Sequence, residues 1–203
     1  MSNILITGEI KKYGVKDGQY PSLWILLDLD AIPYTKDGSN YYLQPNQFFL
    51  SYFLETKDGF SKRNEKAKID SLVNNKFCFI NGLTLKEAKF KRKQDDGSYK
   101  ESIEIAASSK LKDLNVSNTR FTPINYGTVE GTVKSQNGYK ILLEEKYKGL
   151  NGEVKTRDIP IFAPILPNNI TGQNVVFTVS CSGIDPSGNK QLILVADNFF
   201  VIR

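Results

Sequence analysis

Cationic and aromatic residues alternate in one short segment of the chain, residues 89–93, which read Lys-Phe-Lys-Arg-Lys. Lys86 precedes this segment, and Tyr99 and Lys100 follow it across a turn-forming Asp-Asp-Gly-Ser stretch at residues 95–98. In an extended strand, residues 89, 91 and 93 point to one side and residues 90 and 92 to the other. Such a strand presents cations that bind phosphates and rings that stack on bases, a pattern typical of single-stranded nucleic acid binding.

A lysine-rich hairpin also has a purely structural interpretation, because natural proteins use lysine to stop exposed strand edges from pairing with other chains. We favour binding because aromatic residues lie between the charges. The second half of the chain carries a weaker version of the same pattern at Lys134, Tyr139, Lys140, Lys146, Tyr147, Lys148, Lys155 and Arg157.

Trp24, the only tryptophan, lies in a segment where apolar residues alternate over residues 23–29. The alternation has a period of two and predicts a strand. Its apolar phase, which includes Leu23, faces the core in this interpretation, so Trp24 faces outward and is the first candidate for stacking on a base. The alternative is that Trp24 packs under the following loop or against the second half of the chain.

Residues 47–55 predict a further strand with two aromatic rows. Phe53 belongs to one row and Tyr52 to the other, and the pattern does not decide which row faces the core. Both are therefore candidates. The polar loop at residues 33–45 holds three tyrosines that could close over a nucleic acid strand or anchor the loop. The full set of candidate contacts is Trp24, Tyr34, Tyr41, Tyr42, Tyr52, Phe53, Lys86, Lys89, Phe90, Lys91, Arg92, Lys93, Tyr99, Lys100, Lys134, Tyr139 and Lys140.

The elements that must position these residues follow a pattern that occurs twice. Gly8 lies inside the first predicted strand, and Gly131 occupies the same place 123 residues later. In each copy the chain continues through a turn region, which is residues 11–18 in the first copy, and then an apolar strand and a variable insertion. A strand that ends at Gly82 or Gly183, a turn and a last strand complete each copy.

The first copy also contains the chain's one good helix candidate, residues 61–74, with Ser61 as its cap. In the second copy, Asn137-Gly138 is a strong signal for a tight hairpin turn. Pro160 places the third strand of that copy at an edge or a bulge. Residues 109–125 have the composition of a linker between the copies.

Five strands, a glycine where the first strand must coil, and a helix or loop between strands three and four describe an OB-fold. We therefore expect an all-β protein with one short helix and two tandem five-stranded barrels. The first barrel, residues 1–116, carries the long basic hairpin between its fourth and fifth strands, and the second spans residues 117–203. A single sandwich of nine or ten strands explains the strand spacing but not the repeat. In an OB-fold the loop between the last two strands contacts ligand, which supports the binding interpretation of the hairpin.

Composition excludes most catalytic readings. The 203 residues include no histidine, so the commonest general base and zinc ligand is absent. Asp28 and Asp30 share a strand face without a third carboxylate, and no phosphate-binding loop or nucleophile elbow is present. We expect no enzyme activity, no metal and no cofactor. Cys78 and Cys181 occupy corresponding strands and are expected to be buried, reduced thiols.

The net charge of +5 is mild, so local clusters must carry any argument for a polyanion partner. No apolar run is long enough for a membrane span, and the N-terminus lacks a signal pattern. We expect a cytoplasmic protein with no membrane partner, in the host cytoplasm if it is viral.

The chain resembles single-stranded DNA-binding proteins of the OB-fold group, of a phage or mobile-element type. The resemblance implies a non-catalytic protein that protects single strands during replication, recombination or repair. Bacterial and many phage members end in an acidic tail that recruits partners, whereas residues 197–203 here are apolar and end in arginine. Tail-mediated recruitment and tetramers are therefore not implied, and we expect a monomer or weak oligomer. Two alternatives are RNA binding and a protein-interaction module of a replication or virion assembly.

Overall fold

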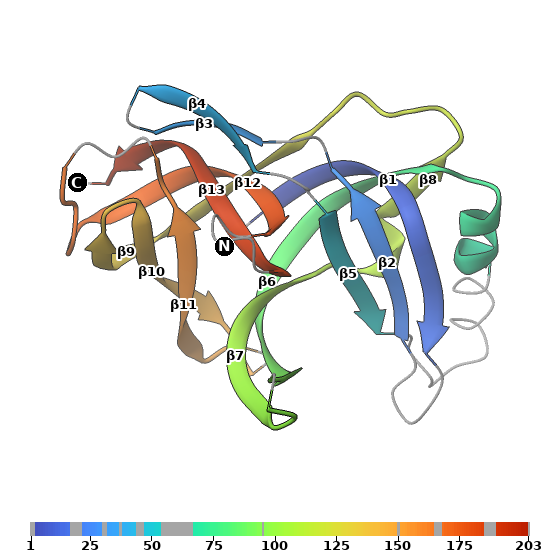
Figure 1. Cartoon of the computed structure of the whole chain (residues 1–203), viewed down its shortest axis with the longest axis horizontal. Coiled ribbons are helices and arrows are strands. Elements are labelled where there is room, and N and C mark those ends of the chain that lie inside the picture. The colour runs from blue at the N-terminus through green and yellow to red at the C-terminus, as the bar shows by residue number, and fades with distance from the viewer. Residues whose placement is uncertain are drawn as a thin grey trace.

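The computed structural model consists mostly of strands. It describes residues 3–16, 22–29, 32–36, 38–43, 47–53, 67–94, 96–149, 151–164, 168–184 and 190–202. Eleven of the strands form one continuous sheet that runs through both halves of the chain. Figure 1 shows the two halves side by side, with a long hairpin projecting between them.

The first half is built around β1 (Asn3–Lys16), which pairs with both β2 (Ser22–Asp28) and β6 (Phe77–Lys93). β2 also pairs with β5 (Gln47–Phe53), and β6 with β7 (Tyr99–Ser108). A helix at residues 67–73 lies between β5 and β6 in the chain. It falls inside the predicted helix, although the cap predicted at Ser61 lies outside the described residues.

The second half repeats this strand arrangement and also closes it into a barrel. β9 (Asn125–Asn137) pairs with β10 (Lys140–Lys148) and β12 (Asn174–Ile184). β10 pairs with β11 (Val154–Phe162), and β12 with β13 (Lys190–Val201). A short parallel ladder between β11 and β13 then closes the barrel. In the first half, β5 and β7 are in contact, but the described residues show no ladder between them.

The repeated glycine coils the first strand of each half. A side chain at Gly8 would press on the backbone of Asp28, and one at Gly131 on the backbone of Glu144. Three residues after each glycine the ladder register shifts, at Lys11 in β1 and at Lys134 in β9. A shift of this kind is a β-bulge, which sharpens the local bend and twist of a strand. The sequence repeat is therefore a repeat of backbone geometry.

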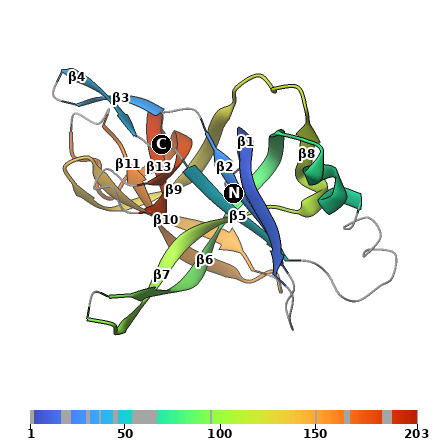
Figure 2. The same ribbon diagram turned by 45° about the vertical axis from the view of Figure 1, so that its right-hand side comes forward.

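Two predicted irregular segments contain regular structure instead. The loop predicted at residues 33–45 contains a hairpin of β3 (Ile32–Lys36) and β4 (Ser39–Leu43). This hairpin lies beside β13 in both Figure 1 and Figure 2. The linker predicted at residues 109–125 contains a 3-10 turn (Leu111–Asp113) and β8 (Leu114–Ser117), which pairs with β6. Hydrogen bonds between β8 and β6 thus order part of a segment that has no strong strand pattern.

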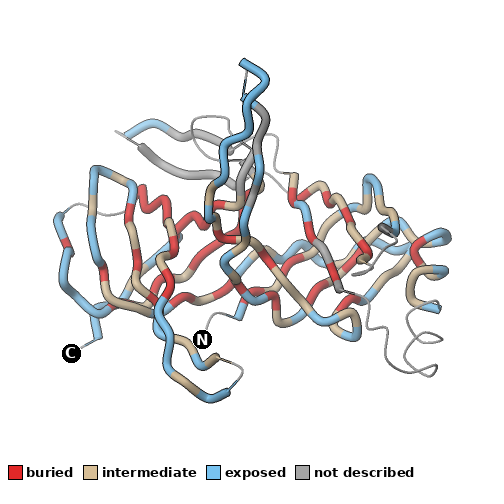
Figure 3. The backbone as a smooth tube through the Cα atoms, turned by 90° about the horizontal axis from the view of Figure 1, so that it is seen from below, coloured by how far each residue is buried: buried red, intermediate tan, exposed pale blue. Residues whose placement is uncertain are grey.

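The two halves share a core. β1 pairs with β9 from Asn3 to Ile6, and one cluster of buried side chains includes residues of both halves. Gly183 of β12 packs directly on the backbone of Gln47 in β5. Buried residues follow the strands of both halves in Figure 3. The domain boundary predicted between residues 116 and 117 stays a prediction, and it falls inside β8.

Both cysteines are buried and unbridged, as predicted, and burial raises the pKa of each thiol to about 12. Among the described residues, no helix has the length and apolar character that crossing a membrane requires.

A buried ion pair joins the root of the long hairpin to the second half. Arg157 of β11 is 8% exposed and Glu145 of β10 is fully buried. The Arg157 Nε donates a hydrogen bond of 2.6 Å to the Glu145 carboxylate, and Nη1 donates to the carbonyl of Leu85 in β6. The guanidinium also lies 4.7 Å from the ring centroid of Tyr147. These contacts hold β6 against the second half.

Replacing Arg157 by methionine should lower the free energy of unfolding by about 3–5 kcal/mol, because Glu145 would lose its buried partner. Urea unfolding followed by circular dichroism measures this loss. The control is Lys155→Met on the same strand, whose 2.8 Å ion pair with Glu153 is exposed and should contribute far less to the free energy of unfolding, because solvent screens it. Equal effects of the two substitutions would contradict the importance of the buried pair.

Candidate nucleic-acid interface

Two aromatic rings from neighbouring strands stack on the outer surface of the first half. Trp24 lies on β2 and Phe49 on β5, diagonal to each other because Phe49 pairs with Leu26. Their ring centroids are 6.3 Å apart and their planes differ by 18°, which is a favourable offset arrangement. Phe49 is 59% exposed. We call Trp24 and Phe49 the aromatic platform.

Gly14 makes room for the indole of the platform. It pairs with Trp24 in the β1–β2 ladder, and a β-carbon added at Gly14 would lie 2.7 Å from Cζ2 of Trp24. Any side chain at this position would displace the ring. The turn predicted to begin at residue 11 is wrong, because β1 continues to Lys16.

Burial shows which of the two rows of side chains on β5 faces the core. Phe48, Leu50 and Tyr52 are each at most 1% exposed and belong to the core. Tyr52 is therefore a wrong candidate, since a buried ring cannot stack on a base, and its burial raises the pKa of its hydroxyl. Phe49 takes its place as the exposed ring of β5. Alternation predicted two rows, but only packing against the rest of the barrel selects the inner one.

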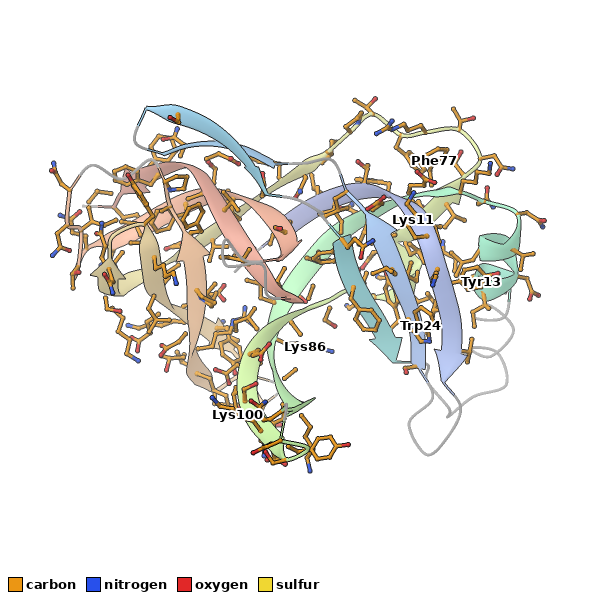
Figure 4. The ribbon with its side chains drawn as sticks, viewed as in Figure 1. Lys11, Tyr13, Trp24, Phe77, Lys86 and Lys100 are labelled. Carbon is orange, nitrogen blue, oxygen red and sulfur yellow. The ribbon has the colours of Figure 1, made fainter. Side chains whose placement is uncertain are left out.

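A groove of about 540 Å³ lies beside Trp24, between β1 and the helix at residues 67–73. Lys12, Tyr13 and Lys76 line it together with apolar side chains of the helix. None of these three was predicted as a contact. Lys12 could have been found by pairing β1 with β2 in the sequence. Lys12 lies opposite Leu26, which belongs to the outward-facing residues of β2. Figure 4 shows Tyr13 and Trp24 on neighbouring strands near the helix.

The long hairpin confirms the predicted separation of its two faces. Lys89 pairs with Ile103 and Lys91 with Glu101, so these residues share one face. Lys91 forms an exposed ion pair of 2.8 Å with Glu101. Residues 86–104 carry six basic and five acidic residues, so the position of each charge matters more than their sum.

Lys86 and Lys100 lie on the opposite face, because their ladder partners are Ala106 and Arg92. At the hairpin root, the neighbouring residues Leu85 and Ala107 point into the core. Lys86 therefore points to the outside of the barrel, as Trp24 and Phe49 do, and β7 is in contact with β5. Partial burial lowers the pKa of Lys86. Figure 4 marks both lysines on the hairpin that projects next to β5. We call this the outer face of the hairpin.

Several predicted contacts have side chains that lie outside the described part of the structure. The backbone places the tyrosine pair 34 and 41 opposite each other in the β3–β4 hairpin. Tyr99, in contrast, is 67% exposed opposite Lys93. The predicted contacts with undescribed side chains are Tyr34, Tyr41, Tyr42, Phe53, Phe90, Arg92 and Lys93.

The candidates of the second half are arranged differently from the platform. Lys134 forms hydrogen bonds of 2.9 and 3.1 Å with the carboxylate of Asp158, which raise its pKa. Tyr139 is half-buried and packs edge-on against Phe162, with 6.1 Å between the centroids. Lys140 is exposed. No stacking surface comparable to Trp24 and Phe49 joins these three residues.

Chemically, the outer face of the first half offers rings and cations. The described residues contain no group of three or more His, Cys, Asp or Glu side chains that could hold a metal ion. The arrangement suits stacking and charge neutralisation of a bound ligand.

Replacing Gly14 by valine should displace the Trp24 indole, because the new side chain would occupy the space of the ring. We expect a changed tryptophan emission maximum and a weaker near-ultraviolet circular dichroism band, while far-ultraviolet dichroism is retained. Glu130→Val, at an exposed strand position of the second half, should leave both signals unchanged. An unchanged emission spectrum in Gly14→Val would show that the indole does not lie over β1.

No model of a known protein family matches the chain, and no curated protein sequence matches it. A solved structure of wild-type single-stranded DNA-binding protein from Thermus aquaticus is similar, with a TM-score of 0.60 and 9% identity over 100% of this chain and 93% of that one. A deletion mutant of the same protein gives a TM-score of 0.60 and 11% identity, over 100% and 95%. At such identities the likeness shows the fold alone. The all-β, OB-type fold predicted from the sequence is thereby confirmed.

Proposed function

We propose that this protein binds single-stranded DNA with little sequence preference and without catalysis. The observation that carries the proposal is the aromatic platform of Trp24 and Phe49 on the outer face of the first half. Strands two and three of an OB-fold form its usual oligonucleotide surface, and β2 and β5 are those strands. The fold shared with the Thermus aquaticus protein supports the proposal.

Ring stacking explains why the binding would tolerate any sequence. Every base has a flat face, so an aromatic side chain can stack on each of them without reading its edge. Phe49 is more than half exposed, and Trp24 stacks beside it. A base placed on this surface would leave its phosphates at the margins of the platform.

Lysines lie in the groove beside the platform and along the hairpin that starts next to β5. Lys12 and Lys76 line the groove beside Trp24, and Lys86 and Lys100 lie on the outer face of the hairpin. A strand that crosses the platform from the hairpin to the groove would meet cations before and after its stacked bases. Most phosphate contacts would be single point charges, because lysine lacks the planar fork of arginine.

We propose that the protein protects single strands during replication, recombination or repair. A phage origin and a cytoplasmic location remain expectations from the sequence. RNA is the second candidate ligand. The 2′-hydroxyl distinguishes the two polymers, so the experiments compare them directly.

Oligo-dT should quench the fluorescence of Trp24, the only tryptophan of the chain, because a stacked base contacts the indole. The affinity should fall steeply between about 50 and 200 mM salt, as counterions are released from the phosphates. Fluorescence titrations at both salt concentrations measure this, with oligo-U in parallel to compare RNA. An absence of binding at low salt would overturn the proposal.

The variant Phe49→Ala provides a local test in the same titration with a labelled oligonucleotide, and should weaken binding by about 1–3 kcal/mol. Phe200→Ala is the matched control, since Phe200 on β13 is also 59% exposed but lies on the second half. Equal losses of affinity in both variants would show that the DNA does not bind at the platform.

The two faces of the hairpin should contribute unequally to DNA binding. Changing Lys86 and Lys100 together to alanine should reduce the logarithmic salt slope by about 1.4, as expected for two lost phosphate contacts. Changing Lys89 and Lys91 together removes the same charge from the opposite face and should change the slope less. A larger effect of the Lys89 and Lys91 change on the salt slope would place the phosphate contacts on the face that carries the Lys91–Glu101 ion pair.

A further inference from the structure

The groove between β1 and the helix at residues 67–73 combines rings, apolar side chains and cations. Its volume of about 540 Å³ falls within the roughly 300–1,000 Å³ of small-molecule sites. Tyr13 and Trp24 line it from the strands, and Val73, which is 68% exposed, lines it from the helix. In Figure 4, Tyr13 lies on the helix side of Trp24. We call this the helix groove.

The described lining of the helix groove carries three cations and no carboxylate. The cations are Lys11, Lys12 and Lys76. Lys11 already lies 3.2 Å from the carboxylates of both Glu9 and Asp28. Lys12 and Lys76 are exposed, and in the part of the chain that the structure describes neither forms an ion pair. These two cations are therefore available to neutralise a phosphate.

Hydrogen bonds hold the end of the helix against β1, so the walls of the groove are pre-formed. The amide of Ile10 donates a hydrogen bond of 2.7 Å to the carbonyl of Lys76. The side-chain amide of Asn75 donates one of 2.6 Å to the carbonyl of Ser71 in the helix. Leu72 is 2% exposed and anchors the helix in the core. A ligand that enters such a groove does not pay for ordering its walls.

A segment at residues 168–173 takes the place of the helix in the second half. The amide of Val133 donates a hydrogen bond of 2.9 Å to the carbonyl of Gln173. This bond corresponds to the one from Ile10, because Val133 and Ile10 each immediately precede the bulge lysine of their strand. The two halves can therefore be compared at this place.

Gln136 bridges this place in the second half. It occupies the position of Tyr13, since both lie two residues after the bulge lysine. The Gln136 side chain donates a hydrogen bond of 3.2 Å to the carbonyl of Asn168 and accepts one of 3.0 Å from the amide of Ile170. The second half thus uses this position to join its own chain segments. The ring at the same position in the first half lines a groove instead.

We propose that the helix groove holds one nucleotide of the bound DNA strand, with its base outside the stack on the platform. The base contacts the ring of Tyr13 and the side chain of Val73, and its phosphate lies near Lys12 and Lys76. A base held between β1 and the helix is separated from any pairing partner, so the groove favours single strands over duplexes. The inference rests on the proposed DNA binding and adds to it a site for one unpaired base.

Photo-crosslinking to an oligonucleotide of 5-iododeoxyuridine tests the proposal on the full chain, because this base bonds to aromatic side chains that contact it. Mass spectrometry of the crosslinked peptides should find bonds at Tyr13 as well as at the platform. Val73→Glu places a carboxylate in the groove and should remove the Tyr13 crosslink while the platform crosslinks persist. Val154→Glu is the matched control and should keep both, since Val154 is also 68% exposed but lies on β11.

The variant Tyr13→Leu removes the ring and keeps an apolar side chain in its place. In titrations with labelled oligo-dT it should weaken binding about tenfold, which is a typical loss for one stacked base. Tyr126→Leu is the matched control, since Tyr126 is a 51% exposed ring on β9, outside the groove. It should change the affinity by less than about twofold, because distant sites act independently.

The outcomes separate this inference from the proposed function. Oligonucleotide binding with crosslinks at Trp24 or Phe49 and none at Tyr13 would overturn the inference and leave the proposed function standing. Equal effects of Tyr13→Leu and Tyr126→Leu on affinity, or a Tyr13 crosslink that persists in Val73→Glu, would also overturn it. An absence of oligo-dT binding at low salt would overturn the proposed function, and the inference with it.

Discussion

The hydrogen-bonded pairing of β1 with three other strands is the constraint on which the rest of the structure depends. β1 pairs with β2 over residues 9–16, with β6 over residues 4–9, and with β9 over residues 3–6. Buried backbone groups must find partners, so these ladders set how the halves meet. Gly8 and the bulge at Lys11 let a single strand coil far enough to serve all three.

The two halves use one backbone plan for two different surfaces. Trp24 and Phe49 form a platform on the first half, whereas Lys140 and Pro160 occupy the equivalent positions on the second. The bulge lysines, in contrast, behave alike, because each forms an ion pair with a carboxylate on another strand. Lys11 pairs with Asp28 on the adjacent β2, and Lys134 with Asp158 on β11, which lies beyond β10. Exposed faces can diverge freely after duplication because backbone ladders and core residues carry the fold.

Much of the fold could be predicted from local pattern. Alternation located most strands, and it placed Trp24 on the outer phase of β2. The two glycines at corresponding places predicted the coiled first strand of each half, and residue types alone predicted the long hairpin. The strand β8 and the β3–β4 hairpin could not be predicted, because segments as short as residues 114–117 carry too little pattern and become strands only when a neighbouring edge pairs with them.

The candidate site was less predictable than the fold. A period of two assigns residues to two faces but does not say which face meets the core, so Tyr52 and Phe49 could be distinguished only by packing. The strands, the repeat and the supply of rings and lysines depend on neighbours along the chain, so they could be predicted without a structure. That Lys86 shares a side with the platform while Glu87 faces the second half depends on contacts between strands far apart in sequence, and only the folded chain shows it.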